Sequence, residues 1–388
     1  MRLLIAGGGT GGHIYPALAV VDALRRRPNP PDLRWLGGHR GLEDRIVPAT
    51  GVPLRRLALR SLRSVGRDVH LALDPIRLGV SIPQAIALLV ADRPAAIFTT
   101  GGYVSIPVLV AARLLGIPAL LWEGNVMPGR SVRATAGLAT VMAVSFSATC
   151  EAVGRGGSAG SRPCLETGTP IRDLGSTDAL AARERFSIAA GERLILVFGG
   201  SQAVKRLNDA VAAALPKLVE RFHVLHVTGE SGYAEALTGR EALPADRRAW
   251  YRPVTFLGHE MPAALAAADL VVGRAGSSTL AEATAVGVPM IVVPYPHAGN
   301  HQRANARVLA DAGAALVVED AEFNAGTLLE AVSVLDDAAR HARMSAAARS
   351  LGRPGAAAAL AAILVALAER RPLPSAADVV AIARSPLP

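Results

Sequence analysis

Two glycine-rich turns and the polar residues beside them are the parts of this chain best suited to chemistry. The first, residues 7–12, ends at His13 and follows an apolar stretch; the second, Gly199-Gly200-Ser201-Gln202, follows another. Glycine lets a backbone turn tightly and lets another molecule approach it closely. A helix starting after such a turn offers unpaired N–H groups and a partial positive charge to an anion. Both turns are therefore candidate phosphate-binding loops.

His13 stands where the first turn meets a helical pattern, so its ring can face a ligand. A histidine there can take a proton from an attacking hydroxyl near neutral pH. A capping or structural histidine is the alternative. The turn also suits a dinucleotide-binding fold, which needs an acid near the end of its second strand. That strand ends Trp35-Leu36-Gly37-Gly38 without a carboxylate, which argues against a dehydrogenase.

Two further loops follow predicted strands in the first half, at residues 100–105 and 122–125. In open parallel sheets, ligands bind beyond the carboxyl ends of the strands. Three such loops on one edge suit a ligand that carries a diphosphate. Glu123 in the last loop either takes part in the reaction or only supports neighbouring loops, and the sequence leaves both interpretations open.

The second half contains another strand–turn–helix pattern, Gly-Arg-Ala-Gly-Ser-Ser-Thr at residues 273–279, with Glu282 further along the helix. A carboxylate only accepts hydrogen bonds, which suits the two hydroxyls of a ribose. The loop at residues 294–302 precedes the next helix, and its Asn300, His301 and Gln302 are candidates for hydrogen bonds to sugar hydroxyls.

Short apolar strands alternate with helical stretches in both halves, which predicts an α/β fold with two parallel sheets in Rossmann-like domains. The predicted strands are 2–6, 32–37, 95–99, 118–121, 140–144, 194–198, 222–228, 253–257, 269–273, 289–293 and 314–318. The predicted helices are 15–26, 79–91 and 105–115, with final helices over about 325–371. The pattern breaks at residues 168–172, where we place the domain junction. The tail, residues 372–388, contains four prolines and is predicted to be loosely ordered.

The chain has 388 residues and a net charge of +9, and the excess lies in its first half. Residues 1–170 contain 19 arginines, no lysine and 10 acidic residues, whereas the rest is balanced. This asymmetry predicts an anionic partner, and a membrane surface fits better than nucleic acid because no nucleic-acid motif accompanies the charge. A generally arginine-rich protein is the alternative.

Five arginines lie between residues 55 and 67 without an acidic residue among them. They are Arg55, Arg56, Arg60, Arg63 and Arg67, and the apolar Leu71, Leu73, Ile76 and Leu78 follow. Such a stretch either lies on an anionic lipid surface or forms a solvated loop.

Cys150 and Cys164 are too few for a disulfide framework and are predicted to pack as small hydrophobic residues in a reducing cytoplasm. The N-terminus has no signal-peptide pattern. No apolar run is expected to reach the roughly 18 residues that span a bilayer. The sequence therefore predicts a soluble or peripheral protein.

Taken together, these motifs resemble the MurG family of peptidoglycan-synthesis glycosyltransferases, from Gly7 to about Arg353. Five motifs in this order carry the resemblance: GGGTGGH at 7–13, GGYVS at 101–105, GGSQ at 199–202, GRAGSSTLAE at 273–282 and NHQRANA at 300–306. The resemblance implies the GT-B fold, with residues 1–168 binding the acceptor and residues 169–352 binding the UDP-sugar. The C-terminal helix, about 353–371, then returns to the first domain.

The resemblance also implies an inverting transfer of N-acetylglucosamine from its UDP donor to the 4-hydroxyl of a muramoyl-pentapeptide on undecaprenyl diphosphate. His13 is then the favoured base, and Glu123 the second catalytic candidate. The residues implied to contact the donor are Thr10, Gly11, Gly12, Asn125, Arg172, Ser201, Gly258, Ser277, Ser278, Thr279, Leu280, Ala281, Glu282 and Gln302. The residues implied to contact the acceptor are Gly9, Gly101, Gly102, Tyr103 and Ser105.

No cofactor is expected, because no carboxylate pair suited to magnesium on a diphosphate is evident. Work at the cytoplasmic face of the bacterial membrane is implied. The chain departs from the family at Trp122 (usually histidine), Gly124 (glutamine), Thr169 (asparagine) and Ala203 (glycine). Alternatives are transfer to another acceptor, a UDP-sugar epimerase that needs no acceptor, and a non-catalytic UDP-sugar sensor.

Overall fold

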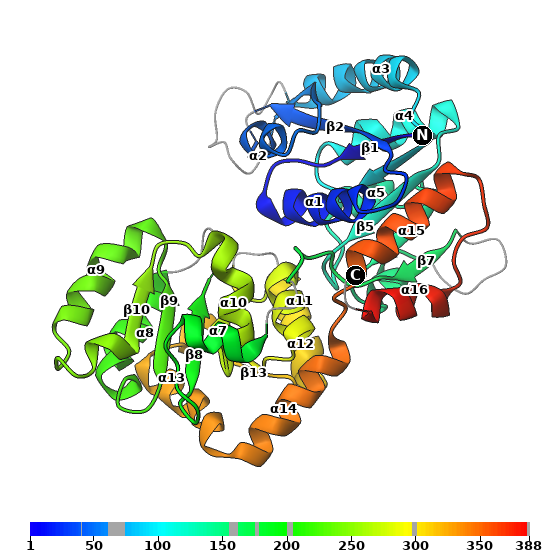
Figure 1. Cartoon of the computed structure of the whole chain (residues 1–388). Coiled ribbons are helices and arrows are strands. Elements are labelled where there is room, and N and C mark those ends of the chain that lie inside the picture. The colour runs from blue at the N-terminus through cyan, green and yellow to red at the C-terminus, as the bar shows by residue number, and fades with distance from the viewer. Residues whose placement is uncertain are drawn as a thin grey trace. The chain divides into compact units, whose positions relative to one another are not determined.

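The computed structural model describes the whole chain except residues 40, 61–73, 155–161, 175–177, 200–204, 297–300 and 386–388. The chain forms two compact units. The first contains Met1–Arg172 and Arg353–Pro388, and the second contains Asp173–Gly352. Each unit is built on one parallel sheet covered by helices (Figure 1).

The first unit has a seven-stranded parallel sheet in the order β3-β2-β1-β4-β5-β6-β7. Its strands are β1 (Arg2–Ala6), β2 (Asp32–His39), β3 (Leu54–Arg60), β4 (Ala96–Thr99), β5 (Ala119–Glu123), β6 (Val141–Val144) and β7 (Cys164–Glu166). The central strands β1, β4, β5 and β6 are apolar and almost wholly buried, as expected when helices cover both faces of a parallel sheet.

The helices of the first unit are α1 (Gly11–Arg25), α2 (Glu43–Ala49), α3 (Asp74–Asp92), α4 (Ser105–Leu115), α5 (Arg130–Thr135), α6 (Ala148–Ala152), α15 (Ala356–Ala368) and α16 (Ala376–Arg384). α1 and α15 pack together on the face that carries Leu3 and Ile5. α3 and α4 cover the other face, which carries Leu4 and Ala6. The alternation of side chains along β1 therefore supplies both cores of the unit.

The second unit has a six-stranded parallel sheet in the order β10-β9-β8-β11-β12-β13. Its strands are β8 (Leu194–Phe198), β9 (His223–Val227), β10 (Tyr251–Val254), β11 (Leu270–Gly273), β12 (Met290–Val292) and β13 (Ala315–Val317). Its α-helices are α7 (Ala179–Arg185), α8 (Lys205–Leu218), α9 (Gly229–Glu241), α10 (Met261–Ala267), α11 (Ser277–Val286), α12 (His301–Asp311), α13 (Ala325–Val332) and α14 (Ala338–Leu351).

Both sheets reverse their strand order at one point, between β1 and β4 in the first unit and between β8 and β11 in the second. In open α/β sheets, ligands bind beyond the carboxyl ends of the strands at such a point. The glycine turns at residues 7–10 and 273–276 follow β1 and β11, so each lies at the switch point of its own sheet. The two Rossmann-like sheets of a GT-B fold are thus confirmed.

The predicted strands are found within a few residues of their expected positions, but β3 and β7 were not predicted. β3 carries three arginines on an edge strand and β7 has only three residues, so neither has a continuous apolar pattern. α1 begins at Gly11 instead of residue 15, which places Pro16 in its second turn.

The expectation of a loosely ordered tail after residue 372 is wrong for residues 376–384, which form α16. Ser375 and Asp378 make a reciprocal capping box, in which each side chain accepts a hydrogen bond from the other residue's backbone N–H. Val379 and Ala383 are fully buried in the core that contains α15. The four prolines flank this helix and do not interrupt it, so the capping signal outweighs the proline content.

Cys150 and Cys164 form a disulfide with a Cα–Cα distance of 5.9 Å, which corrects the prediction that both are simple hydrophobic residues. The bond links α6 to β7. β6 and β7 are neighbouring parallel strands, and the chain between them brings the two cysteines together. Because β7 was not predicted, this proximity could not be read from the sequence.

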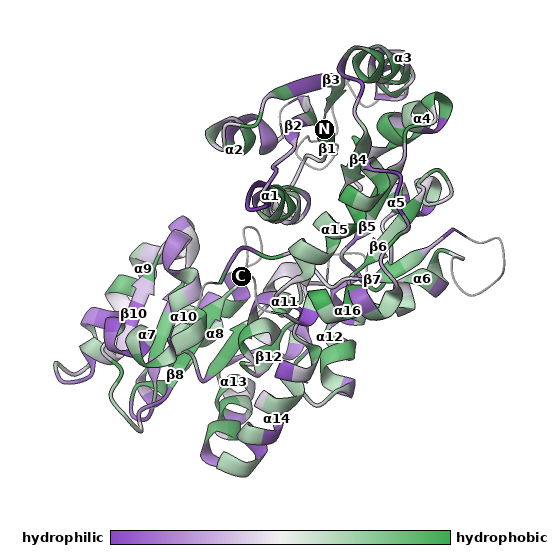
Figure 2. Cartoon of the chain, turned by 45° about the vertical axis from the view of Figure 1, so that its right-hand side comes forward, coloured by the Kyte–Doolittle hydropathy of each residue, from purple (hydrophilic) through white to green (hydrophobic). Residues whose placement is uncertain are grey.

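Two helical stretches are long and apolar enough to cross a bilayer by length and composition alone, contrary to expectation. One stretch, residues 338–368, contains α14 and α15, and 67% of its apolar 18-residue window is buried. The other is α3, where only 17% of such a window is buried. Figure 2 shows that α3 carries many hydrophobic residues.

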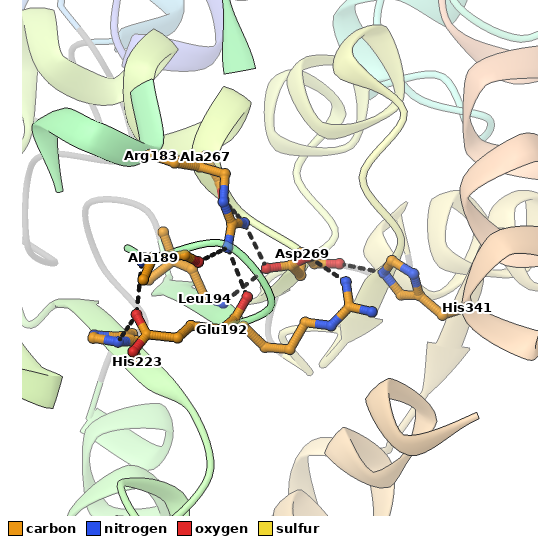
Figure 3. A network of polar contacts seen from close by, with 9 residues as sticks. Arg183, Ala189, Glu192, Leu194, His223, Ala267, Asp269 and His341 are labelled. Atoms are coloured by element: carbon orange, nitrogen blue, oxygen red, sulfur yellow. Dashed lines mark hydrogen bonds and ion pairs between the residues drawn. The ribbon is translucent and has the colours of Figure 1, made fainter. Parts of the chain in front are cut away.

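A polar network supports the amino-terminal edge of the second sheet (Figure 3). The Asp269 carboxylate pairs with Arg183 and Arg193 and accepts the Leu194 N–H. His341 contacts the Asp269 carbonyl at 2.7 Å. Because strands β8 and β11 begin here, the network lies at the edge opposite to the glycine turns and is structural.

Candidate functional site

His13 is held by the loop that follows β4. Its Nδ1 lies 2.7 Å from the carbonyl oxygen of Thr100, and the Thr100 hydroxyl donates to the His13 carbonyl at 2.9 Å. A carbonyl oxygen can only accept, so Nδ1 carries the proton of the neutral ring. Nε2 is therefore the ring nitrogen with the lone pair, which is the arrangement that a general base requires.

Gly101 and Gly102 provide the surface on which the His13 ring lies. Their φ angles are +81° and +78°, a region that side chains rarely adopt. A methyl group added at Gly102 would lie 3.5 Å from both Nε2 and Cδ2 of the ring. The two glycines predicted to contact the acceptor are thus also the residues that pack on the histidine.

The first turn of α1 lies beside this histidine. Thr10 is the N-cap in extended conformation, and its side chain makes no capping hydrogen bond. Gly11 and Gly12 follow, and the first N–H groups of a helix have no acceptor within the helix. Thr10 and Gly11 are half-buried and Gly12 is exposed. This turn can therefore receive an anionic ligand.

Two other predicted acceptor residues contact the protein itself. The Tyr103 hydroxyl donates to the Glu43 carboxylate at 2.9 Å, and burial together with that charge raises the pKa of Tyr103. Ser105 is fully buried, and its hydroxyl donates to the Gly102 carbonyl at 2.7 Å. Ser105 thus acts by supporting the loop.

Glu43 is a site residue that sequence reasoning missed. It is fully buried and accepts hydrogen bonds from Gly9, Gly38 and Tyr103. The dinucleotide-binding pattern places an acid at the end of β2, whereas this carboxylate stands at the start of α2, and its side chain points toward the turn after β1 and the end of β2. In the sequence, Glu43 is a single glutamate that follows three nearby glycines, and this pattern matches no recognised motif.

Glu123 supports the loop that carries Asn125. One carboxylate oxygen accepts the backbone and side-chain N–H groups of Asn125, both at 2.9 Å, and the other accepts the Gly129 N–H at 2.9 Å. Of the two interpretations of Glu123, these contacts favour loop support. The family departure at Trp122 is a core residue, whose indole N–H donates to the Gly168 carbonyl.

In the second unit, the turn after β11 approaches its neighbour closely. A methyl group at Gly273 would lie 2.7 Å from the Phe198 carbonyl oxygen, so only glycine fits there. Gly276 is the N-cap of α11, and Ser277, Ser278 and Thr279 form its half-buried first turn.

Further along α11, the predicted donor residues differ in exposure. Leu280 lies in the core, so only its backbone can contact a ligand, while Ala281 is half-buried. Glu282, the candidate ribose ligand, is 6% exposed and stands in the second turn.

Gln302 connects the loops after β11 and β12. Its side-chain oxygen accepts the N–H groups of Ala275 at 3.1 Å and Tyr295 at 2.9 Å. With the oxygen so occupied, the NH2 group points away from both loops, and Gln302 offers a ligand only donors. Asn305, on the same helix, donates to the Ala275 carbonyl at 3.2 Å.

Arg274 is a second residue that sequence reasoning missed. It is 4% exposed, donates to the Val293 carbonyl at 3.1 Å and pairs with Asp320 at 2.5 Å. Arg206, near the start of α8, pairs with the same aspartate at 3.1 Å. Two guanidinium groups thus share one carboxylate beside the turn after β11.

The other predicted donor residues lie on separate segments of the chain. Gly258 begins a short 3-10 helix (Gly258–Glu260) after β10, with a φ of +50°. Arg172 is exposed at the end of the first unit. Ser201 and Asn300 lie outside the described residues. Within the described ranges, no group of three or more histidine, cysteine or acidic side chains could hold a metal ion.

Known proteins resemble both units. Residues 3–144 match the glycosyltransferase family 28 N-terminal domain, and residues 194–360 match the C-terminal domain of that family. A UDP-N-acetylglucosamine--N-acetylmuramyl-(pentapeptide) pyrophosphoryl-undecaprenol N-acetylglucosamine transferase of Desulforudis audaxviator is 40% identical over 92% of this chain and 95% of its own length. A transferase of the same name from Frankia casuarinae is 39% identical over 93% and 94%.

Solved structures agree with this similarity. The crystal structure of MurG from Acinetobacter baumannii superposes with a TM-score of 0.75 at 28% identity, over 94% of this chain and 99% of that chain. A glycosyltransferase from Streptomyces sp. SF2575 superposes with a TM-score of 0.57 over 99% and 100%, but at 18% identity this likeness concerns the fold alone.

Proposed function

This chain belongs to glycosyltransferase family 28, among the N-acetylmuramyl-(pentapeptide) pyrophosphoryl-undecaprenol N-acetylglucosamine transferases, and we propose that it catalyses their reaction. N-acetylglucosamine passes from UDP to the 4-hydroxyl of the muramic sugar of the lipid-linked acceptor, with inversion at the anomeric carbon. The observation that carries the mechanism is the contact between His13 Nδ1 and the Thr100 carbonyl. It leaves Nε2 to receive the proton of the attacking hydroxyl.

The second unit holds the donor in this proposal. The first turn of α11 and the charge of Arg274 meet the UDP diphosphate, and Glu282 accepts hydrogen bonds from the ribose hydroxyls. Gln302 and Asn125 contact the N-acetylglucosamine, and the backbone at Gly258 meets the uracil. As the glycosidic bond breaks, negative charge grows on the diphosphate, and fixed donors and the guanidinium stabilise it. A metal ion is therefore not required for departure of UDP.

The first unit holds the acceptor. The loops after β1 and β4 receive the lipid-linked diphosphate near the first turn of α1, and the muramic hydroxyl lies at His13. General-base catalysis by a positioned histidine contributes about 10²–10⁴-fold. Glu123 contributes by fixing Asn125 instead of transferring a proton.

We also propose that α3 lies on the anionic membrane surface that carries the acceptor. Its exposed residues include Ile76, Val80, Pro83, Ala87 and Val90, which form an apolar stripe along one helical face. Two arginines of the neighbouring β3 are less available than the sequence suggested, because Arg55 pairs with Asp92 and Arg56 with Asp44. Arg63 and Arg67 lie outside the described residues. Apolar contact therefore carries much of the binding.

Sedimentation with vesicles tests the membrane proposal. Ile76→Glu and Val80→Glu place charges in the stripe and should reduce binding to vesicles with anionic lipid, while transfer to a soluble acceptor persists. Leu180→Glu changes an equally exposed leucine of the second unit and serves as the control. If the α3 variants bound vesicles as well as the unsubstituted chain, α3 would not be the membrane-binding element.

Transfer of labelled N-acetylglucosamine to a soluble analogue of the lipid-linked muramoyl-pentapeptide, with chelator present, tests the activity itself. A β-linked product formed without metal is expected. Product from the donor alone would indicate an epimerase, and tight UDP-sugar binding without turnover on any acceptor would indicate a sensor. Transfer only to other acceptors would show that the chain is a glycosyltransferase but that the proposed acceptor is wrong.

A further inference from the structure

Glu43 is a fully buried carboxylate for which the proposed mechanism has no use. Its Oε2 accepts the Gly9 N–H at 2.8 Å, and its Oε1 accepts the Gly38 N–H at 3.1 Å and the Tyr103 hydroxyl at 2.9 Å. All three partners are donors, as an ionised carboxylate requires. A buried charge is tolerated only when hydrogen bonds of this kind replace water. The residue therefore connects the end of β2, at Gly38, with the loops that follow β1 and β4.

The surrounding glycines make room for this side chain. A methyl group at Gly8, Gly37 or Gly41 would lie under 3.0 Å from the Glu43 side chain. A methyl group at Gly38 would collide in the same way with the Tyr103 ring. Several glycines of the first unit thus accommodate a carboxylate and a phenol of the protein itself.

In a dinucleotide-binding fold, glycines after the first strand let the backbone approach a pyrophosphate. Here an internal anion accepts the Gly9 N–H that such a ligand would use. A second anion cannot share that donor without repulsion from the carboxylate. The Gly9 N–H of the turn after β1 is consequently occupied before any substrate arrives.

We propose that Glu43 is the positioning residue of the acceptor site. It fixes the loops after β1 and β4 against the end of β2 beside His13, and it directs the acceptor's diphosphate to the first turn of α1, away from Gly9. The turn after β1 leads directly into His13, and the loop that contains Tyr103 also contains the two glycines that pack on the His13 ring. This inference rests on the proposed function, because it assigns these loops to the acceptor.

The test compares Glu43→Gln with Asp44→Asn in the full chain. Glutamine keeps the shape but turns an NH2 group toward one of the three donors. Asp44 is the next residue of α2 and pairs at the surface with Arg56, so its change removes the same charge outside the network. We expect Glu43→Gln to lower kcat/KM for the acceptor about 10- to 100-fold, because small displacements in a catalytic site cost that much. The Kd for UDP should stay within about twofold, since the second unit binds it.

Hydrogen exchange supplies a readout that does not depend on activity. Peptides covering residues 7–12, 36–39 and 101–105 should exchange faster in Glu43→Gln and unchanged in Asp44→Asn. Unchanged exchange, or acceptor kinetics equal to those of the unsubstituted chain, would overturn the inference. If the unsubstituted chain transfers nothing to the acceptor analogue, the proposed function fails, and exchange alone decides whether Glu43 fixes the loops.

Tyr103→Phe tests the same network if the Glu43 variant does not fold. It removes one donor and leaves the carboxylate with Gly9 and Gly38. A smaller loss of acceptor kcat/KM, about 3- to 10-fold, is expected because two of the three hydrogen bonds to the carboxylate remain, with UDP binding retained. Full activity in Tyr103→Phe would contradict the network.

Discussion

The turns after β1 and β11 both connect a strand to a helix through glycines but differ in the side chains that support them. The turn after β1 packs on the buried Glu43 carboxylate, which accepts two backbone N–H groups and a phenol. The turn after β11 is supported by the neutral Gln302 and by Arg274, whose aspartate is shared with a second arginine. One turn therefore carries an internal anion, while the other is supported by an amide and a guanidinium group.

Under the proposed function, with the donor bound by the second unit and the acceptor by the first, this difference separates the two tasks of a glycosyl transfer. The donor unit must attract a diphosphate and stabilise the negative charge that grows on it, which donors and a guanidinium do. The acceptor unit must hold a neutral imidazole in one tautomer, which needs defined loops more than positive charge. An internal carboxylate defines those loops and disfavours a misplaced phosphate. The predictions below alter one side of this comparison at a time.

The largest effect is expected from His13→Ala. Loss of the base should lower turnover about 10²–10⁴-fold. UDP should bind as before, because the contacts proposed for its diphosphate, ribose and uracil lie in the second unit. Initial rates with the soluble acceptor and calorimetry with UDP measure the two quantities.

A matched change at Thr100 keeps the base. Thr100→Val removes the hydroxyl but retains the carbonyl that binds Nδ1, so turnover should fall far less than in His13→Ala. If His13→Ala retains most of its turnover, the proton is removed by another group and the tautomer argument fails.

The second prediction concerns acid, which should unfold the second unit first. His226 is 2% exposed, and burial lowers its pKa from 6.5 to about 4. Tyr251 and Asn208 occupy its two ring nitrogens. Between pH 6.5 and 4, His226 binds a proton in the unfolded chain but stays neutral in the folded unit. Stability is thus complete above pH 6.5 and falls by about 3 kcal/mol as the pH drops to 4.

Hydrogen exchange of β9 against β1 across this pH range measures the difference between units. Neither histidine described in the first unit, His13 or His39, is buried as His226 is, so β1 serves as the internal comparison. His226→Gln does not titrate and should flatten the pH dependence of β9. An unchanged slope in that variant would assign the acid sensitivity to other groups.

The sequence predicted most of the fold because its signals were local. Apolar strands ending at glycines identified β1, β4, β8 and β11, and with them both switch points. His13 and the first turn of α11 followed from the same patterns. The missed elements, β3 and β7, lack an apolar run, and their positions depend on pairing with neighbouring strands.

The residues that support the site were not predictable, because their partners are distant in the chain. Glu43 meets Gly9 and Tyr103 across 34 and 60 residues, and Arg274 meets Asp320 across 46. No spacing rule links such residues before the sheet order is known. The positions proposed to face ligands had local motifs, whereas the supporting contacts required the fold.

A third change makes the second turn resemble the first. Gln302→Glu keeps an oxygen for Ala275 and Tyr295 but replaces the donor NH2 with an acceptor and adds a negative charge. We expect the Kd for UDP-N-acetylglucosamine to rise about 10- to 100-fold, because hydrogen bonds to charged groups are worth about 1.5–3 kcal/mol. Gln302→Met removes polarity without charge and should weaken donor binding less. Equal effects of both changes would show that charge is unimportant there.

The smallest effect is expected at Glu123, and it distinguishes loop support from proton transfer. Glu123→Gln retains an oxygen for Asn125 and places an NH2 group opposite the Gly129 N–H. A supporting residue should then lose only about 3- to 10-fold in turnover, as expected for one weakened hydrogen bond. A general base would instead lose about 10²–10⁴-fold, as predicted for His13→Ala. The pH–rate profile of Glu123→Gln should keep the shape of the unsubstituted chain's profile. If the part of the profile that reflects deprotonation of the base disappeared in this variant, Glu123 would be the proton acceptor and His13 a supporting residue.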